Sequence, residues 1–200
     1  MACTTCGGSW RPRGGTVPSE LEAYYELALS PVYADTGIQA HLPTIRKYAE
    51  NVDRIIELGV GGGDQGTAAL LAAKPMSLDS YDVSAPGSLP ILNVYAQENN
   101  VKFTFHLGRT QDSEPVDADL IMVDSYHDAA TVDAELAKFM SHVTTYAIFH
   151  DVCSFGRAGQ SGAPNTGINL SIADYLFRHP EWRVKEFSDT DNGLLVLEHS

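Results

Sequence analysis

Short apolar runs alternate with amphipathic stretches along the chain from residue 53 to the end. Runs of this length, bounded by turn residues, are typical of buried strands. They predict strands at residues 53–58, 76–83, 101–107, 119–124, 145–150, 181–187 and 193–199. The stretches between them have helical spacing and predict helices at residues 64–73, 88–99, 128–142 and 167–178. Strands that alternate with helices indicate a parallel sheet with helices on both faces.

The last two predicted strands are joined only by residues 188–192. A parallel connection needs a crossover of about a dozen residues or more, so these two strands are expected to form an antiparallel hairpin. The whole pattern predicts an α/β fold. Its core is a Rossmann-like, seven-stranded, mostly parallel sheet with an antiparallel C-terminal hairpin and helices on both faces.

The chain before the first strand divides into two parts. Glycine and proline are frequent at the start, which predicts a flexible segment. Ser19 and Glu22 then form a capping-box pattern that begins one helix, and a second helix is expected from about residue 38 to 49. We therefore expect a flexible segment (1–18), helices that cap the ligand site (19–50) and the main domain (51–200).

Composition and charge restrict the class of partner. The chain has 44% hydrophobic and 20% charged residues, which is ordinary for a soluble globular protein. Its formal net charge is −13, and so acidic a surface repels phosphate backbones and anionic lipids. No apolar run approaches the roughly 18 residues that span a bilayer, and the start lacks the apolar segment of a secretory signal. We expect neither a nucleic-acid nor a membrane partner.

The three cysteines do not suggest a disulfide or zinc framework. Cys3 and Cys6 form a single CxxC near the start and Cys153 stands alone, whereas a zinc ribbon needs a second pair. Free thiols favour a reducing compartment, so we expect a cytoplasmic protein. A metal site shared between chains stays an alternative, and the sequence leaves open whether the protein forms a homo-oligomer.

A glycine-rich turn follows the first predicted strand. Glu57 lies at the end of that strand, Gly59, Gly61 and Gly63 come directly after it, and Asp64 is expected to cap the next helix. Glycines let the backbone turn sharply and let a ligand approach it closely. Ligands of open α/β sheets bind beyond the carboxyl ends of the strands, which is where this turn is expected to lie.

Asp82 ends the second predicted strand. A carboxylate at this place can accept hydrogen bonds from both hydroxyls of a ribose. NAD-binding and S-adenosylmethionine (SAM)-binding folds share this feature, so it does not separate them. Residues 61–66 also satisfy G-x-G-x-x-G, the dinucleotide fingerprint, although they begin past the end of the strand. Asp79 competes with Asp82 for the role, but it lies further from the strand end.

Acidic and histidine side chains follow the fourth and fifth predicted strands. Asp124 ends the fourth strand and His127 follows it, while His150 and Asp151 end the fifth. Neighbouring parallel strands bring their carboxyl ends together, so the two carboxylates are expected to converge. They repel each other unless they share a cation or a proton. Oxygen ligands suit Mg²⁺, whereas an imidazole from His150 favours Mn²⁺, Fe²⁺ or Zn²⁺.

Three of these motifs resemble those of known methyltransferases. Glu57 followed by the alternating glycines resembles motif I of class I SAM-dependent methyltransferases, in which the loop faces the methionine half of the cofactor. Residues 108–112 are similar to a loop of catechol-type O-methyltransferases. That likeness implies that Thr110 and Gln111 lie near the adenine.

The acidic cluster resembles the metal-dependent O-methyltransferases of the catechol, macrolide-sugar and cephalosporin hydroxylase-like groups, over about residues 35–199. The resemblance implies that Asp124 and Asp151 bind the metal and that His127 is the general base. The chain departs from the family at His150, where an acid is usual. This residue is a third candidate ligand.

We therefore predict a SAM-dependent O-methyltransferase. Its cofactors are expected to be SAM and a divalent metal, Mg²⁺ or alternatively Mn²⁺ or Fe²⁺. Its acceptor is expected to be a hydroxyl of a small molecule, such as a sugar, a polyketide or a catechol-like ring. The long loop at residues 152–167 is expected to cover the site. The alternatives are a metal-dependent hydroxylase or oxidoreductase and a non-catalytic SAM-binding module.

Overall fold

The computed structural model describes residues 19–33, 37–62, 64–162 and 166–200. The strands are β1 (Arg54–Leu58), β2 (Ser77–Asp82), β3 (Lys102–Leu107), β4 (Ala118–Val123), β5 (Val143–His150), β6 (Trp182–Ser188) and β7 (Leu194–His199). The α-helices are α1 (Glu20–Ala28), α2 (Leu42–Ala49), α3 (Gln65–Ala72), α4 (Leu89–Glu98), α5 (Ala129–Phe139) and α6 (Ile168–Arg178). Short 3₁₀ turns are η1 (Pro31–Tyr33), η2 (Gln39–His41), η3 (Thr110–Asp112) and η4 (Met140–His142).

The seven strands form one sheet in the order β3-β2-β1-β4-β5-β7-β6. Strands β1 to β5 are parallel, and β7 runs antiparallel between β5 and β6. The predicted sheet and its C-terminal hairpin are confirmed. The chain builds the sheet outward from β1 to β3 and then returns to β4 on the other side of β1. This reversal makes a crevice at the carboxyl ends of β1 and β4, where ligands of such sheets bind.

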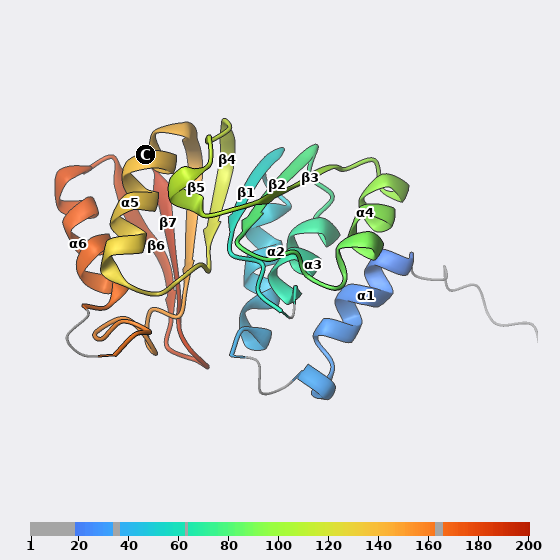
Figure 1. Ribbon diagram of the computed structural model, residues 1–200, viewed down its shortest axis with the longest axis horizontal. Coiled ribbons are helices and arrows are strands. Elements are labelled where there is room, and N and C mark those ends of the chain that lie inside the picture. Colours follow the sequence, from blue (N-terminus) through green and yellow to red (C-terminus); the bar gives the residue numbers. More distant parts are fainter. Residues whose placement is uncertain (1–18, 34–36, 63, 163–165) are drawn as a thin grey trace, which may run out of the picture.

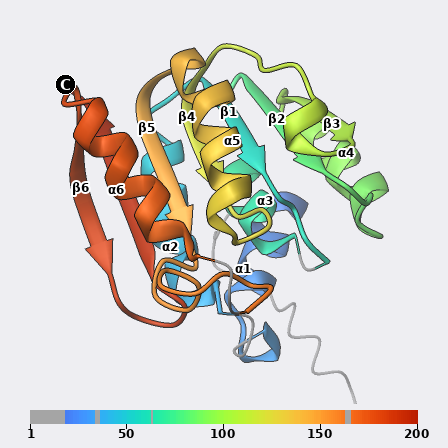
Figure 2. The ribbon, with the colours of Figure 1, turned by 60° about the vertical axis from the view of Figure 1, so that its left-hand side comes forward.

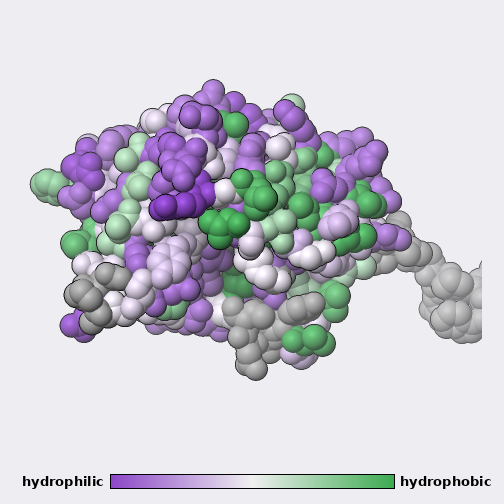
Figure 3. All heavy atoms as spheres, viewed as in Figure 1, coloured by the Kyte–Doolittle hydropathy of each residue, from purple (hydrophilic) through white to green (hydrophobic). Residues whose placement is uncertain are grey.

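Helices cover both faces of the sheet (Figures 1 and 2). Helices α1 to α4 pack on one face and α5 and α6 on the other, and each face has its own apolar core. Leu71 belongs to the first core and Phe139 to the second, and both are fully buried. Full burial of one such side chain contributes roughly 1.5–3 kcal/mol. Figure 3 shows hydrophilic side chains at the upper left, near α5, and hydrophobic ones near the centre of this face.

The N-terminal helices pack on the sheet of their own chain. Leu21 of α1 and Ile45 of α2 are fully buried in the same core as Leu70 of α3. Half of the predicted capping box is present: the Ser19 hydroxyl accepts from the Glu22 N–H at 3.2 Å, whereas the Glu22 carboxylate accepts from Arg46 at 2.7 Å. No helix of the described residues is long and apolar enough to cross a bilayer. The predicted flexible segment 1–18, with Cys3 and Cys6, lies outside the described residues.

Asp64 corrects one detail of the sequence prediction. It occupies the N-cap position of α3, but its side chain makes no capping hydrogen bond. Its backbone is left-handed, with φ of 46°, whereas a capping residue is normally extended. The carboxylate instead accepts hydrogen bonds from the Tyr24 hydroxyl of α1, at 2.8 and 2.9 Å. Asp64 therefore ties α1 to the turn that precedes α3.

Candidate active site

A cavity of about 520 Å³ opens beyond the carboxyl ends of β1, β2, β3 and β4. It lies at the crevice that the strand order creates. Most of the residues singled out in the sequence line it, from the glycine turn, the strand ends and the two loops after β3 and β4. These are Gly59, Gly61, Asp82, Thr110, Gln111, Asp124 and His127. Glu57, His150 and Asp151 do not line it, and Gly63 lies outside the described residues.

The glycine turn brings β1 into contact with the end of β4. Gly59 has a φ of 89°, and an added Cβ would overlap the backbone carbonyl of Asp124. The Asp124 N–H donates to the Leu58 carbonyl at 2.8 Å, which holds the two strand ends together. Gly61 also has a positive φ, 66°, but faces open space. Only glycine fits at residue 59, because both the backbone angle and the close approach exclude a side chain.

Asp82 supports this turn from the end of β2. Its Oδ2 accepts the N–H groups of Val60 and Gly61, both at 2.9 Å. Burial raises the pKa of Asp82, but the hydrogen bonds from the backbone of Gly61, Ser84 and Val60 outweigh it and hold the pKa below its usual value. The carboxylate is therefore ionised and faces the cavity. The competing candidate, Asp79, instead binds His106 at 2.8 Å and does not line the cavity.

Glu57 lies beneath the turn instead of in the cavity. It is 1% exposed and accepts hydrogen bonds from Ser80 at 2.6 Å and from Thr67 of α3 at 2.9 Å. Burial raises the pKa of Glu57 to about 8, although the two hydroxyls oppose this. Glu57 therefore joins β1, β2 and α3 and carries a proton near neutral pH.

The raised pKa of Glu57 predicts that stability falls as the pH rises. Between its ordinary pKa of 4.5 and about 8, the folded protein keeps a proton that the unfolded chain releases. We expect Glu57→Gln to match the wild type near the lower limit and to be more stable by about 5 kcal/mol above the upper one. Urea unfolding at several pH values measures this difference. A difference that does not change with pH would contradict the assignment.

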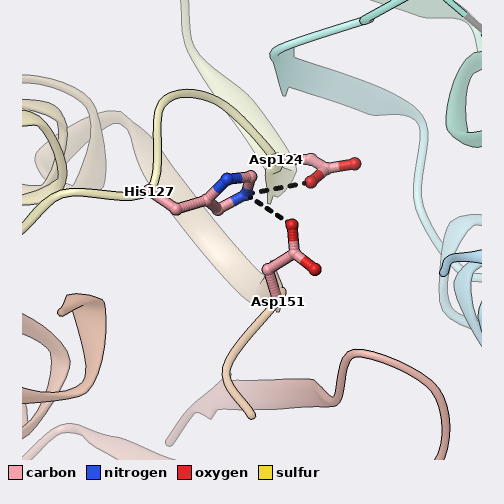
Figure 4. Close-up of side chains that lie close together, drawn as sticks. All are labelled: Asp124, His127 and Asp151. Carbon is pink, nitrogen blue, oxygen red and sulfur yellow. Dashed lines mark hydrogen bonds and ion pairs between the residues drawn. The ribbon is translucent and has the colours of Figure 1, made fainter. Parts of the chain in front are cut away.

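Asp124, His127 and Asp151 form a compact cluster beside the cavity (Figure 4). Nε2 of His127 lies 3.2 Å from Oδ1 of Asp124 and 3.1 Å from Oδ2 of Asp151. One possible ligand atom from each of the three residues lies within 4.8 Å of the others. The loop after β4 carries His127 back over the strand end, and Asp151 follows β5 with a left-handed φ of 63°. The adjacent strands β4 and β5 thus bring the two carboxylates together.

His150 lies behind this cluster and is 3% exposed. Its Nδ1 is 3.0 Å from Oδ1 of Asp124, and its Nε2 is 2.9 Å from the carbonyl oxygen of Gly37. Burial lowers the pKa of His150, but the hydrogen bond to Asp124 and the charges of both carboxylates outweigh it and raise the pKa to about 9. Both ring nitrogens therefore carry protons and face protein acceptors.

The charges of the cluster are unevenly balanced. Hydrogen bonds from His127 and His150 hold the pKa of Asp124 below its usual value despite its burial. Burial keeps the pKa of Asp151 above its usual value, because the nearby histidines offset only part of that effect. Burial also opposes protonation of His127, but its bond to Asp124 raises the pKa of the imidazole. Oδ1 of Asp151 is buried and has no hydrogen-bond partner among the described residues, with Nδ1 of His150 3.6 Å away. Such an oxygen beside a second carboxylate and an imidazole fits a small cation.

The loop after β5 encloses His127. The Phe155 ring stacks on the imidazole, with centroids 5.1 Å apart and 15° between the planes. Oε1 of Gln160 lies 3.2 Å from Nδ1 of His127. This contact makes Nδ1 a donor and directs Nε2 at the two carboxylates. Among the described residues of this loop, Gln160 lines the cavity and Arg157 is exposed.

Glu135 of α5 is a cavity residue that the sequence prediction missed. It is 1% exposed and accepts hydrogen bonds from Thr110 at 2.6 Å and Ser125 at 2.8 Å. Burial raises the pKa of Glu135 to about 7, although both hydroxyls oppose this. The helical spacing of the sequence does indicate a buried position, because Glu135 lies on the same face of α5 as Val132 and Leu136.

The comparisons with known proteins place the fold. No protein-family model matches the sequence, and no curated protein matches it. Among solved structures, the SAH-bound methyltransferase PaMTH1 of Podospora anserina superposes with a TM-score of 0.56 and 16% identity, over 92% of this chain and 89% of that one. A proposed caffeoyl-CoA O-methyltransferase of Staphylococcus aureus gives 0.59 and 17%, over 92% and 93%.

The magnesium protoporphyrin IX methyltransferase of Synechocystis PCC 6803, with bound S-adenosylhomocysteine (SAH), gives a TM-score of 0.59 and 11% identity. The match covers 90% of this chain and 94% of that one. At these identities the likeness shows the fold alone. The chain therefore has the Rossmann-like fold that these methyltransferases use.

Proposed function

We propose that the protein is a SAM-dependent methyltransferase that transfers a methyl group to a hydroxyl of a small molecule with the help of a divalent cation. The observation that carries this proposal is a single cavity that joins the glycine turn and Asp82 at one end to Asp124 and His127 at the other. The cavity would thus hold a nucleotide-like cofactor next to the side chains that take the proton from the acceptor hydroxyl. The solved methyltransferases with the same fold support the choice of SAM.

The proposed cofactor spans the cavity along the strand ends. Asp82 would accept a hydrogen bond from a ribose hydroxyl with the lone pair of Oδ1 that Ser84 leaves free, because Val60 and Gly61 both donate to Oδ2. The backbone of Gly59 and Gly61 would face the methionine half, where the absence of side chains leaves room. Thr110 and Gln111 line the part of the cavity proposed for the adenine. The cavity volume is within the range typical of small-molecule sites.

A divalent cation fits the carboxylate pair. Asp124 and Asp151 would hold it, and their charges make an oxygen-rich site that suits Mg²⁺ or Mn²⁺. The cation would lower the pKa of an acceptor hydroxyl. The sequence prediction also named His150 as a ligand. Because Asp124 and Gly37 occupy both of its nitrogens, we propose that His150 orients Asp124 from behind.

His127 is the proposed general base. Its Nδ1 proton points to Gln160, so Nε2 is the atom that would take the proton of the acceptor hydroxyl. For this, a cation held by Asp124 and Asp151 would have to replace the Nε2 proton that these carboxylates accept here. Phe155 stacks on the ring and limits its rotation. The acceptor oxygen would then attack the methyl carbon in line while the bond from that carbon to the sulfonium sulfur breaks, which leaves SAH and the methyl ether. Alignment of the two reactants within the shared cavity would supply much of the rate acceleration.

Transfer of a labelled methyl group from SAM tests the proposal. The acceptors are catechols, vicinal sugar diols and polyketide alcohols, each assayed with Mg²⁺, with Mn²⁺ and with excess chelator. We expect labelled product from at least one hydroxyl acceptor, and loss of at least about 100-fold of the rate with chelator. Product formed at an equal rate in chelator would contradict the role of the cation. Labelling of amines alone would contradict O-methylation.

A further inference from the structure

Two hydroxyl groups on different loops meet the same buried carboxylate. Thr110 belongs to the turn after β3 and Ser125 to the loop after β4, and Glu135 of α5 lies between them. The Thr110 hydroxyl donates to Oε1 at 2.6 Å and the Ser125 hydroxyl donates to Oε2 at 2.8 Å. All three residues line the same cavity. One side chain thus determines the orientation of both hydroxyls in this wall.

The position of the loop after β3 does not depend on Glu135 alone. Lys138, also on α5, donates from Nζ to the backbone carbonyls of Gln111 at 2.7 Å and Ser113 at 2.6 Å. Lys138 therefore anchors the backbone of the loop. The two hydrogen bonds of Glu135 come from side-chain hydroxyls of the loops and not from their backbone. Its contribution is therefore to orient these hydroxyls.

The orientation determines what the wall can recognise. An ionised carboxylate only accepts hydrogen bonds, so both hydroxyl protons must point toward Glu135. The two hydroxyl oxygens then have only lone pairs left for a ligand. A wall of acceptors favours a ligand with N–H donors and disfavours one with a carbonyl oxygen at the same place.

We propose that Glu135 is a positioning residue that makes this wall selective for the amino group of adenine over the oxo group of hypoxanthine. The proposal rests on the proposed function, because it places the nucleoside half of SAM against Thr110 and Ser125. It assigns a specificity role to a residue of α5 that lies outside the glycine turn and the carboxylate cluster.

Calorimetric titration with two ligands tests the proposal. The ligands are SAH and its inosine counterpart, and the titrations are made at about pH 8, where the Glu135 carboxyl is mostly ionised. We expect the wild type to bind SAH about 10-fold or more tightly than the inosine counterpart. In Glu135→Gln the amide donates to one hydroxyl, which then turns its own proton outward. We expect SAH to bind about 10-fold more weakly and the ratio of the two affinities to approach one.

A control substitution and a second variant on the other side of the hydrogen bond complete the test. Glu98→Gln, at the exposed end of α4, should leave both affinities within about twofold of the wild type. Thr110→Val keeps the Glu135 carboxylate and replaces one of the two hydroxyls by a methyl group of similar volume. It should therefore also lower the ratio of the affinity for SAH to that for the inosine counterpart. Its effect should be non-additive with that of Glu135→Gln, because both act through one hydrogen bond. The Thr110→Val titration tests the proposal even if the Glu135→Gln protein does not fold.

Failure of this inference differs from failure of the proposed function. A wild type that binds neither ligand would overturn the proposed cofactor. A wild type that binds SAH, together with a folded Glu135→Gln and a Thr110→Val that both keep the wild-type ratio, would overturn the role of Glu135 alone. Circular dichroism establishes that each variant is folded.

Discussion

Asp124→Asn is expected to lower the rate of methyl transfer by roughly 10²–10⁴-fold. The amide has the same shape but no charge, so it weakens the proposed cation site and the hydrogen bonds from His127 and His150. The cofactor half of the cavity is formed by other residues, so the affinity for SAH should change by less than about threefold. Steady-state kinetics and calorimetry with SAH measure the two effects separately.

Asp117→Asn is the matched control for Asp124→Asn. Asp117 precedes the same strand and its side chain is 73% exposed, where it pairs with His142 at 3.0 Å. Its replacement should leave rate and affinity unchanged within about twofold, because exposed pairs contribute little. An Asp124→Asn enzyme that keeps its rate would remove the carboxylate cluster from the reaction.

Gly59→Ala is expected to destabilise the fold by more than about 3 kcal/mol and to abolish SAH binding. Alanine is strained at a φ of 89°, and its methyl group would overlap the backbone of Asp124 and press on Ser125. The neighbour is backbone instead of a movable side-chain end, so the two strand ends must separate. Guanidinium unfolding and calorimetry measure the loss.

Gly62→Ala is the control within the same turn. Within the part of the chain that the structure describes, an added Cβ at Gly62 meets nothing within 4 Å, and its φ is not positive. We expect a change of stability within about 1 kcal/mol and little change in affinity. Equal effects of the two substitutions would mean that the contact between β1 and β4 does not control the site.

The elements of the fold follow from local pattern, whereas part of their arrangement does not. Each predicted strand and helix is present close to its expected range, because buried faces repeat with the period of the element. The insertion of β7 between β5 and β6 depends on pairing between distant segments, and the short link predicts the hairpin but not its place. The packing of α1 and α2 on their own chain is likewise a tertiary outcome.

The candidate site was only partly visible in the sequence. Strand ends predict which residues meet, and Asp124, His127 and Asp151 do lie together. The sequence predicts that Asp64 caps α3, but the hydrogen bond from Tyr24 holds its carboxylate instead. Glu135 was not expected, because an acid in a helix is normally solvated and only its place on the apolar face distinguishes it.

Calorimetric titration of the wild-type protein with SAH, and in parallel with NAD⁺, is the most direct test of the central claim. Both ligands suit a Rossmann-like sheet with an acid at the end of β2, so the sheet alone does not choose between them. We expect micromolar affinity for SAH and no measurable binding of NAD⁺. Binding of NAD⁺ without binding of SAH would contradict it.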